Sequence, residues 1–365
     1  MILLSTYFMS HQDNLVFADS AFKTDTEVYS VYDEDFNLLF QKDLVEIGDE
    51  YLSNEFKLYE VVYIDSDNHK GLAKFIRNIE IPKVDISYAP KPISTKERKI
   101  CMYMSHNDES YLNGDGVDSV YGNGGIRDVA QALKNELEKN LITVYFDDTL
   151  HIPHDAGAYT RSGATARYLY NAHSPDAIFD IHRDATSRAF YTANVNGVER
   201  CKVRIVIGKS NPNRAINEEF ALYLVAVANE MYPWLITDIY YGGGHYNQNL
   251  DGKAILFEMG TYLMEKDKVI DTTKELAEVV TTALYGTTVN EETGDLTING
   301  VEDEENIIIN DYFDKKQDDG IGITSLIVSL IFFAGVCCYV LYLVLRKNRK
   351  LFKISKRKFL TNLIF

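Results

Sequence analysis

Cysteine is scarce in this chain. Four cysteines occur in 365 residues. Cys337 and Cys338 are adjacent inside an apolar run, whereas Cys101 and Cys201 stand far apart and form no C-x-x-C spacing. The pattern therefore indicates neither a disulfide framework nor a cysteine-rich metal site.

Positive charge is also in short supply, and it is unevenly placed. The chain has 37 basic against 54 acidic residues, a formal net charge of −17. Eight of the basic residues lie between Ile321 and the C-terminus, where no acidic residue occurs. The rest of the chain is therefore strongly acidic and should be repelled by nucleic acid and by anionic lipid. We expect no nucleic-acid partner.

One long uncharged apolar run lies near the C-terminus. Ile321–Leu345 has 25 residues with no charge and no proline, which is long enough to cross a bilayer as one transmembrane helix. The basic residues follow directly, so the positive-inside rule predicts a cytoplasmic tail over residues 346–365 and an extracytoplasmic body. We expect a single-pass membrane protein with a C-terminal anchor, in which the acidic residues 287–320 form a flexible tether.

Two patterns of periodicity divide the body. Residues 10–92 have β-branched and alternating segments that predict a small β-rich module. Residues 95–286 alternate between strand and helix patterns, which is typical of an α/β fold with a mostly parallel sheet flanked by helices. The expected strands are 99–105, 142–146, 177–182 and 253–257, a hairpin is expected within 189–208, and the expected helices are 126–141, 160–172, 213–232 and 265–285.

Three of the expected strands end on residues that bind metals or move protons. The first runs into His106, with Glu109 three residues later, and the others run into His182 and Glu258. In open α/β sheets, ligand sites lie at the carboxyl ends of strands. Two imidazoles and a carboxylate can supply three ligands of a zinc site, and a further glutamate nearby can take a proton from water. A zinc hydrolase is the leading hypothesis.

Each of these residues has a simpler interpretation when taken alone. The pattern H-x-x-E is common by chance, and a histidine that ends a strand is often a core residue. However, His182 is flanked by Asp180 and Asp184, either of which can accept its second N–H, as metal-bound histidines require. Glu258 follows an apolar run, where an unpaired carboxylate would be costly. It is therefore either paired or functional.

Other polar residues could contact a substrate. Arg161 and Arg183 can bind carboxylates or stabilise an oxyanion, although an ordinary salt bridge would explain either one. Three glycines at 242–244 precede His245, Asn247 and Gln248. This run matches neither a P-loop nor G-x-G-x-x-G, which argues against nucleotide binding. We interpret it as a loop that reaches a sugar or a peptide.

Five segments in this order resemble the stage II sporulation protein P family of endospore-forming bacteria: SHNDESYL (105–112), YTRS (159–162), DIHRD (180–184), HYNQNL (245–250) and ILFEMG (255–260). The resemblance covers roughly Lys99–Tyr285, and residues 48–62 are also similar to members of this family. The family is related to zinc N-acetylmuramoyl-L-alanine amidases and hydrolyses peptidoglycan during engulfment of the forespore.

The resemblance implies an amidase-like catalytic domain with Zn2+ on His106 and His182 and with Glu258 as the catalytic carboxylate. Related amidases take a ligand glutamate from the start of the first helix. Residues 125–128 offer none, so we assign Glu109 as the third ligand. Arg183 is expected to orient Glu258 or the substrate, and Arg161, His245, Asn247 and Gln248 are expected to bind substrate. The typical family member has an N-terminal membrane segment, whereas the anchor expected here is C-terminal.

These expectations amount to a membrane-anchored bacterial zinc amidase that cleaves stem peptides from peptidoglycan, with endopeptidase cleavage as a further activity. The implied protein partners are other engulfment proteins, such as stage II sporulation proteins D and M. Two alternatives stay open. One is a zinc carboxypeptidase-like enzyme, and the other is a non-catalytic wall-binding or scaffolding protein with the same fold.

Overall fold

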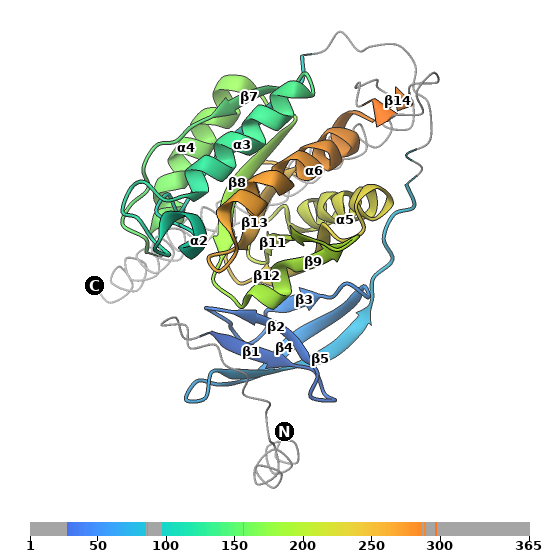
Figure 1. The fold of residues 1–365 in the computed structure, drawn as a ribbon. Helices are drawn as coiled ribbons and strands as arrows, with labels where there is room; N and C mark the ends of the chain where they lie inside the picture. Colours follow the sequence, from blue (N-terminus) through green and yellow to red (C-terminus); the bar gives the residue numbers. More distant parts are fainter. Residues whose placement is uncertain are drawn as a thin grey trace, which may run out of the picture. The chain divides into compact units, whose positions relative to one another are not determined.

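A single large sheet organises the described part of the chain (Figure 1). The computed structural model describes residues 28–84, 86, 97–155 and 157–286, together with two short strands at 288–289 and 296–297. The sheet consists of β1 (Tyr29–Tyr32), β2 (Leu38–Lys42), β3 (Glu50–Leu52), β4 (Lys57–Asp65), β5 (Lys70–Asn78), β6 (Lys99–Tyr103), β7 (Thr143–Phe146), β8 (Ala177–Asp184), β11 (Val203–Gly208), β12 (Ile236–Gly242) and β13 (Ala254–Thr261). Its strand order is β2-β1-β5-β4-β3-β12-β11-β13-β8-β6-β7.

Helices cover the central strands. They are α2 (Leu112–Asp115), α3 (Ile126–Lys139), α4 (Ala158–His173), α5 (Arg214–Met231) and α6 (Lys266–Tyr285), with short 3-10 turns η2 (Arg188–Tyr191) and η3 (Gln248–Leu250). α6 lies between α3 and α5, and α4 packs against β6 (Figure 1). The connection through α3 leads from β6 outward to the edge strand β7, and the connection through α4 leads back from β7 to β8, on the other side of β6. Because such crossovers are right-handed, these two helices lie on opposite faces.

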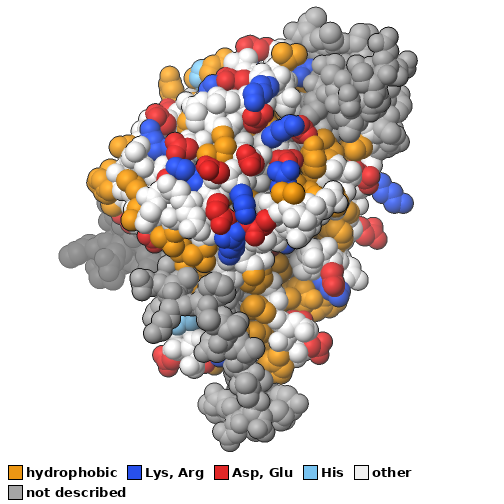
Figure 2. All heavy atoms as spheres, in the orientation of Figure 1, with side chains coloured by type: hydrophobic (Ala, Val, Ile, Leu, Met, Phe, Trp, Pro, Cys, Tyr) orange, Lys and Arg blue, Asp and Glu red, His pale blue; other side chains and the backbone are white. Residues whose placement is uncertain are grey.

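The helix pattern of the sequence explains how α3 packs. Ile126, Val129, Leu133 and Leu137 recur every three or four residues and are all buried. The opposite side of α3 is polar, and Figure 2 shows acidic and basic side chains interspersed over this helical face. Lys266 of α6, for example, lies 2.8 Å from the Asp128 carboxylate of α3.

The predicted fold class, a mostly parallel sheet, is wrong. Five neighbouring strand pairs are parallel and five are antiparallel, so the sheet is mixed. The chain leaves β8 through the hairpin of β9 (Thr192–Val195) and β10 (Val198–Cys201), without a crossover helix. Parallel neighbours need such a crossover. As a result, β11 runs antiparallel to β13.

The strands of the β-rich module belong to the same sheet. Its strand β3 pairs antiparallel with β12, where Tyr51 lies opposite Tyr240. The sequence patterns had not indicated a strand at β12. Phe40 of β2 stacks on Tyr51 with ring centroids 4.7 Å apart and meets Tyr240 edge-on at 5.5 Å. The module and the central strands therefore share one apolar cluster, because burial of these rings stabilises both.

A helix long and apolar enough to cross a membrane does not occur among the described residues. The span expected at Ile321–Leu345, the tether at 287–320 and the basic tail at 346–365 lie outside the described residues, apart from β14 (Thr288–Val289) and β15 (Leu296–Thr297).

Because Phe40 packs against both parts of the sheet, we expect Phe40→Ala to destabilise the whole unit. Phe40 is 0% exposed, and removal of a fully buried phenyl ring costs about 3–5 kcal/mol. Phe75 of β5 is 40% exposed, so Phe75→Ala is the matched control and should cost less than about 1 kcal/mol. Chemical denaturation measures both free energies of unfolding. An equal loss in the two variants would contradict the shared core.

Candidate metal centre

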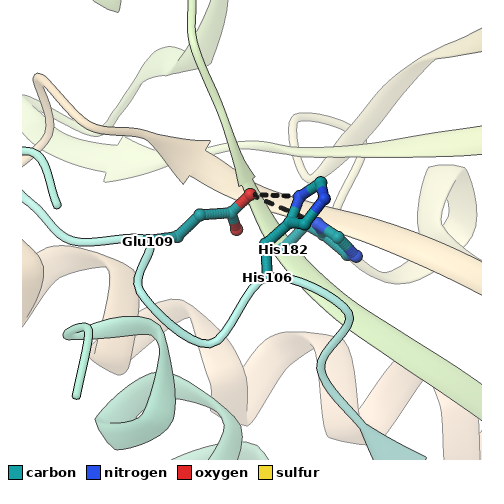
Figure 3. A group of neighbouring side chains, drawn as sticks. All are labelled: His106, Glu109 and His182. Atoms are coloured by element: carbon teal, nitrogen blue, oxygen red, sulfur yellow. Dashed lines mark hydrogen bonds and ion pairs between the residues drawn. The ribbon is translucent and has the colours of Figure 1, made fainter. Parts of the chain in front are cut away.

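Three side chains with metal-ligand chemistry meet at the ends of β6 and β8. One possible ligand atom each of His106, Glu109 and His182 lies within 4.8 Å of the others. Oε1 of Glu109 lies 3.1 Å from Nδ1 of His106 and 3.3 Å from Nδ1 of His182. Figure 3 shows the carboxylate pointing at both imidazoles. Two nitrogen donors and one carboxylate oxygen are a ligand set that zinc takes in catalytic sites, so these residues fit the metal.

Backbone contacts hold the ligand loop in place. The second oxygen of Glu109, Oε2, accepts a hydrogen bond of 2.8 Å from the backbone N–H of Arg183. The carbonyl oxygen of Glu109 accepts one of 3.0 Å from the N–H of Ile126, at the start of α3. Gly124 makes this close approach possible, because a Cβ there would lie 2.2 Å from that carbonyl oxygen. The loop therefore orients Glu109 from both ends.

Asp180 orients His182 from behind. Its Oδ1 lies 2.9 Å from Nε2 of His182, in an ion-pair contact. The Asp180 carboxylate is itself fixed, because it accepts hydrogen bonds from the backbone N–H and the hydroxyl of Ser105 at 2.8 and 2.5 Å. This contact leaves Nδ1 of His182 directed at Glu109. A carboxylate behind a ligand histidine is the arrangement that fixes the ring for metal binding.

The electrostatics of the cluster favour a cation. Burial raises the pKa of the Glu109 carboxyl, but the imidazoles of His182 and His106 outweigh this effect and hold that pKa well below its usual range. Burial lowers the pKa of His182, but Asp180 and Glu109 together raise it well above its usual range. Two carboxylates around one imidazole thus draw positive charge into the site, and a metal ion can supply that charge.

Glu258 lies beside the metal cluster, on β13. In the sheet register it is the partner of His182 on one side and of Arg204 on the other. It is buried, and burial raises its pKa to about 7, against the lowering effect of Lys42. Among the described residues, its Oε2 atom has no hydrogen-bond partner. A buried carboxyl with one free oxygen and a pKa near neutrality suits a proton acceptor.

Two residues near the metal cluster were not predicted from the sequence. Lys42, from the β-rich module, places its ammonium 3.3 Å from Oε1 of Glu258. His154 stacks on His106 with ring centroids 3.8 Å apart, and its Nδ1 lies 2.9 Å from the Asp108 carboxylate. Nothing in the sequence around either residue indicates a functional site. A lysine that ends a strand and a histidine between expected elements are ordinary surface patterns.

The sequence of this chain matches a known protein family. The family model described as stage II sporulation protein P matches residues 27–281. The chain belongs to the stage II sporulation protein P family. The resemblance found in the sequence motifs is thereby confirmed. The matched range includes β1 to β5 as well as the metal cluster.

Solved structures are similar to this member of the stage II sporulation protein P family only at a distance. An N-acetylmuramoyl-L-alanine amidase from Clostridium difficile 630 is 15% identical, with a TM-score of 0.33, over 51% of this chain and 94% of that chain. The amidase AmiC2 of Nostoc punctiforme is 11% identical, with a TM-score of 0.34, over 52% and 96%. The catalytic domain of the CD27L endolysin targeting Clostridia Difficile is 12% identical, with a TM-score of 0.32, over 51% and 96%. No curated protein matches this chain.

The two arginines that were expected at the site, Arg161 and Arg183, both form hydrogen bonds to loop residues. The Arg183 side chain donates to the carbonyl oxygens of Ser110 at 3.3 Å and Asp118 at 2.9 Å. Arg161 donates to the carbonyl oxygen of His151 at 2.9 Å and to the Asp155 carboxylate at 2.7 Å. Neither guanidinium contacts Glu258 through a hydrogen bond or ion pair that the structure records. Their catalytic and substrate-binding roles stay predictions.

The residues after the glycine run differ in their surroundings. Gln248 is buried, and its amide accepts from the Gly208 N–H and donates to the Val206 carbonyl, both at 2.7 Å. Asn247 donates to the Ser162 hydroxyl at 3.0 Å. His245 is exposed. Of these three residues only His245 is exposed, whereas Gln248 is buried and uses both its oxygen and its NH2 group in contacts with the backbone.

The three-ligand cluster predicts that the purified protein binds about one zinc ion per chain. His182→Ala should lose most of this zinc, because it removes one of three ligands and leaves the others poorly placed. The control is His173→Ala, since His173 stacks on Tyr145 and is not part of the cluster. Elemental analysis after zinc loading and dialysis measures the content. A wild-type protein that retains no zinc would refute the site.

Proposed function

We propose that this protein is a peptidoglycan hydrolase of spore formation, and that it acts as a zinc-dependent N-acetylmuramoyl-L-alanine amidase. The observation that carries the proposal is the convergence of His106, Glu109 and His182 beside the buried carboxyl of Glu258. Membership of the stage II sporulation protein P family supports a role in sporulation. The cleaved bond in this proposal is the amide between the muramic acid lactyl group and L-alanine.

In this mechanism His106, Glu109 and His182 hold the metal. The chemistry that zinc supplies when bound is Lewis-acid activation of water and of the amide carbonyl. Glu258 accepts a proton from the attacking water at its free Oε2. The hydroxyl then bonds to the carbonyl carbon, and the C–N bond breaks. Glu258 returns the proton to the leaving amine, so the carboxylate is regenerated. A pKa near 7 matches both proton transfers.

The two alternatives find less support. A carboxypeptidase-like enzyme needs a cation that binds the terminal carboxylate of its substrate. The nearby arginines, Arg161 and Arg183, already bond to backbone carbonyls of the fold. A scaffolding protein has no need of a buried carboxyl oxygen without a hydrogen-bond partner, because such a group costs stability. Other buried oxygens, such as Oε2 of Glu275, also lack a partner among the described residues, but Glu258 lies next to three potential metal ligands, and this position favours catalysis.

Glu258→Gln tests the proton-transfer role. The amide cannot take a proton from water, so turnover of purified peptidoglycan should fall by roughly 10² or more. Zinc content should not change, because Glu258 is not a ligand. Mass spectrometry of the released muropeptides identifies the new termini, and Glu60→Gln on β4 is the control. Full activity of Glu258→Gln would assign the base to another residue.

Because peptidoglycan lies outside the cytoplasmic membrane, the proposal also places the catalytic body there. External protease applied to intact protoplasts should then digest the body, whereas a cytoplasmic marker protein stays intact. Protection of the body would argue against wall hydrolysis. Other engulfment proteins as partners stay a prediction.

A further inference from the structure

We propose that Lys42 of the β-rich module is a positioning residue of the catalytic centre, which binds Oε1 of Glu258 and so leaves Oε2 as the oxygen that accepts the proton. This inference rests on the proposed function, in which Glu258 moves the proton. It assigns to the module a direct part in the chemistry of a site otherwise built from the central strands.

The geometry places the Lys42 ammonium between two carboxylates. Its Nζ atom lies 3.0 Å from Oδ1 of Asp184 and 3.3 Å from Oε1 of Glu258. The side chain is only 14% exposed. Burial lowers the pKa of Lys42, but Asp184 and Glu258 outweigh that effect and raise it well above its usual range. The ammonium is therefore charged, and a buried ammonium needs the anions that it contacts.

The packing of the module fixes where this ammonium can go. Lys42 ends β2, opposite Tyr29 of β1, and follows two residues after Phe40 in the shared apolar cluster. Its ammonium also lies 5.4 Å from the ring centre of Tyr240, on β12. The packing of Phe40 on Tyr51 and Tyr240 thus holds the end of β2, and with it Lys42, against the central part of the sheet.

Asp184 is the anchor in this arrangement. Its Oδ2 accepts hydrogen bonds from Arg204 at 2.8 Å and from the Tyr191 hydroxyl at 2.9 Å. Its Oδ1 accepts one from the Ala185 N–H at 2.8 Å, besides that from Lys42. Because these partners are rigid, Asp184 holds the ammonium on one side, and a remaining N–H of the ammonium is directed at Glu258.

The two oxygens of Glu258 are distinguished by this contact. Oε1 is bound to Lys42, whereas Oε2 is buried and has no hydrogen-bond partner among the described residues. Without the ammonium, the carboxyl group could rotate, and its negative charge would face Asp184 without compensation. Lys42 therefore fixes which oxygen is free to accept the proton.

The test compares three variants of the full chain. Lys42→Met keeps the length of the side chain but removes the charge, so kcat on peptidoglycan should fall about 10²-fold, as for a misplaced catalytic group. KM and zinc content should stay the same. Lys42→Arg keeps a cation and should restore most of kcat. Lys57→Met is the matched control, since Lys57 forms an ion pair with the exposed Glu55 carboxylate, away from Glu258, and it should not change kcat.

A second measurement does not need turnover. Carbon-13 NMR of the Glu258 carboxyl in the metal-free protein should show a higher pKa in Lys42→Met than in the wild type, because a neighbouring cation is lost. An unchanged kcat in Lys42→Met, an unchanged Glu258 titration, or a loss of zinc in parallel with activity would overturn the inference. A wild-type protein without turnover would instead refute the proposed function, and the titration would still decide the role of Lys42.

Discussion

The structure depends on a buried arginine. Arg204, on β11, is 1% exposed and binds Asp238 of β12 through two hydrogen bonds of 2.9 Å. Its third contact is with Asp184 of β8. Tyr51 of β3 donates to Asp238 as well, at 3.0 Å. One guanidinium therefore joins four strands, and the charge tolerates burial only because every partner is present.

This network sets the electrostatics of the site. Across β11, β13 and β8, the register places Arg204, Glu258 and His182 in one row. Arg204 and Lys42 are two cations, whereas Asp184, Asp238 and Glu258 are three carboxyl groups. The two cations balance Asp184 and Asp238, so the charge of an ionised Glu258 is not balanced by this group. This count agrees with the pKa of about 7 for Glu258, which burial raises.

Local chemistry in the sequence indicated four candidate site residues that lie close together in the structure. His106, Glu109, His182 and Glu258 follow apolar strand patterns, and the structure brings them together because β6, β8 and β13 are parallel neighbours. The strand ends were less accurate, since His182 and Glu258 lie inside longer strands. The periodicity of apolar residues shows which face of a strand is buried, but it does not show at which residue the strand stops pairing with its neighbour.

The sequence could not predict Lys42 or the mixed sheet, because both depend on strand partners far apart in the chain. The pairing of β3 with β12 joins residues about 190 positions apart, and nothing in either segment specifies the other. Phe40 of β2 then packs on Tyr51 and Tyr240 across this pairing, and Lys42, two residues later, reaches Glu258. Among the described residues, the cation in ion-pair contact with Glu258 is Lys42, which comes from the β-rich module. The β-rich module therefore supplies a charge to a site whose other residues lie on or after β6, β8 and β13, and this contact depends on the packing of the two parts of the sheet.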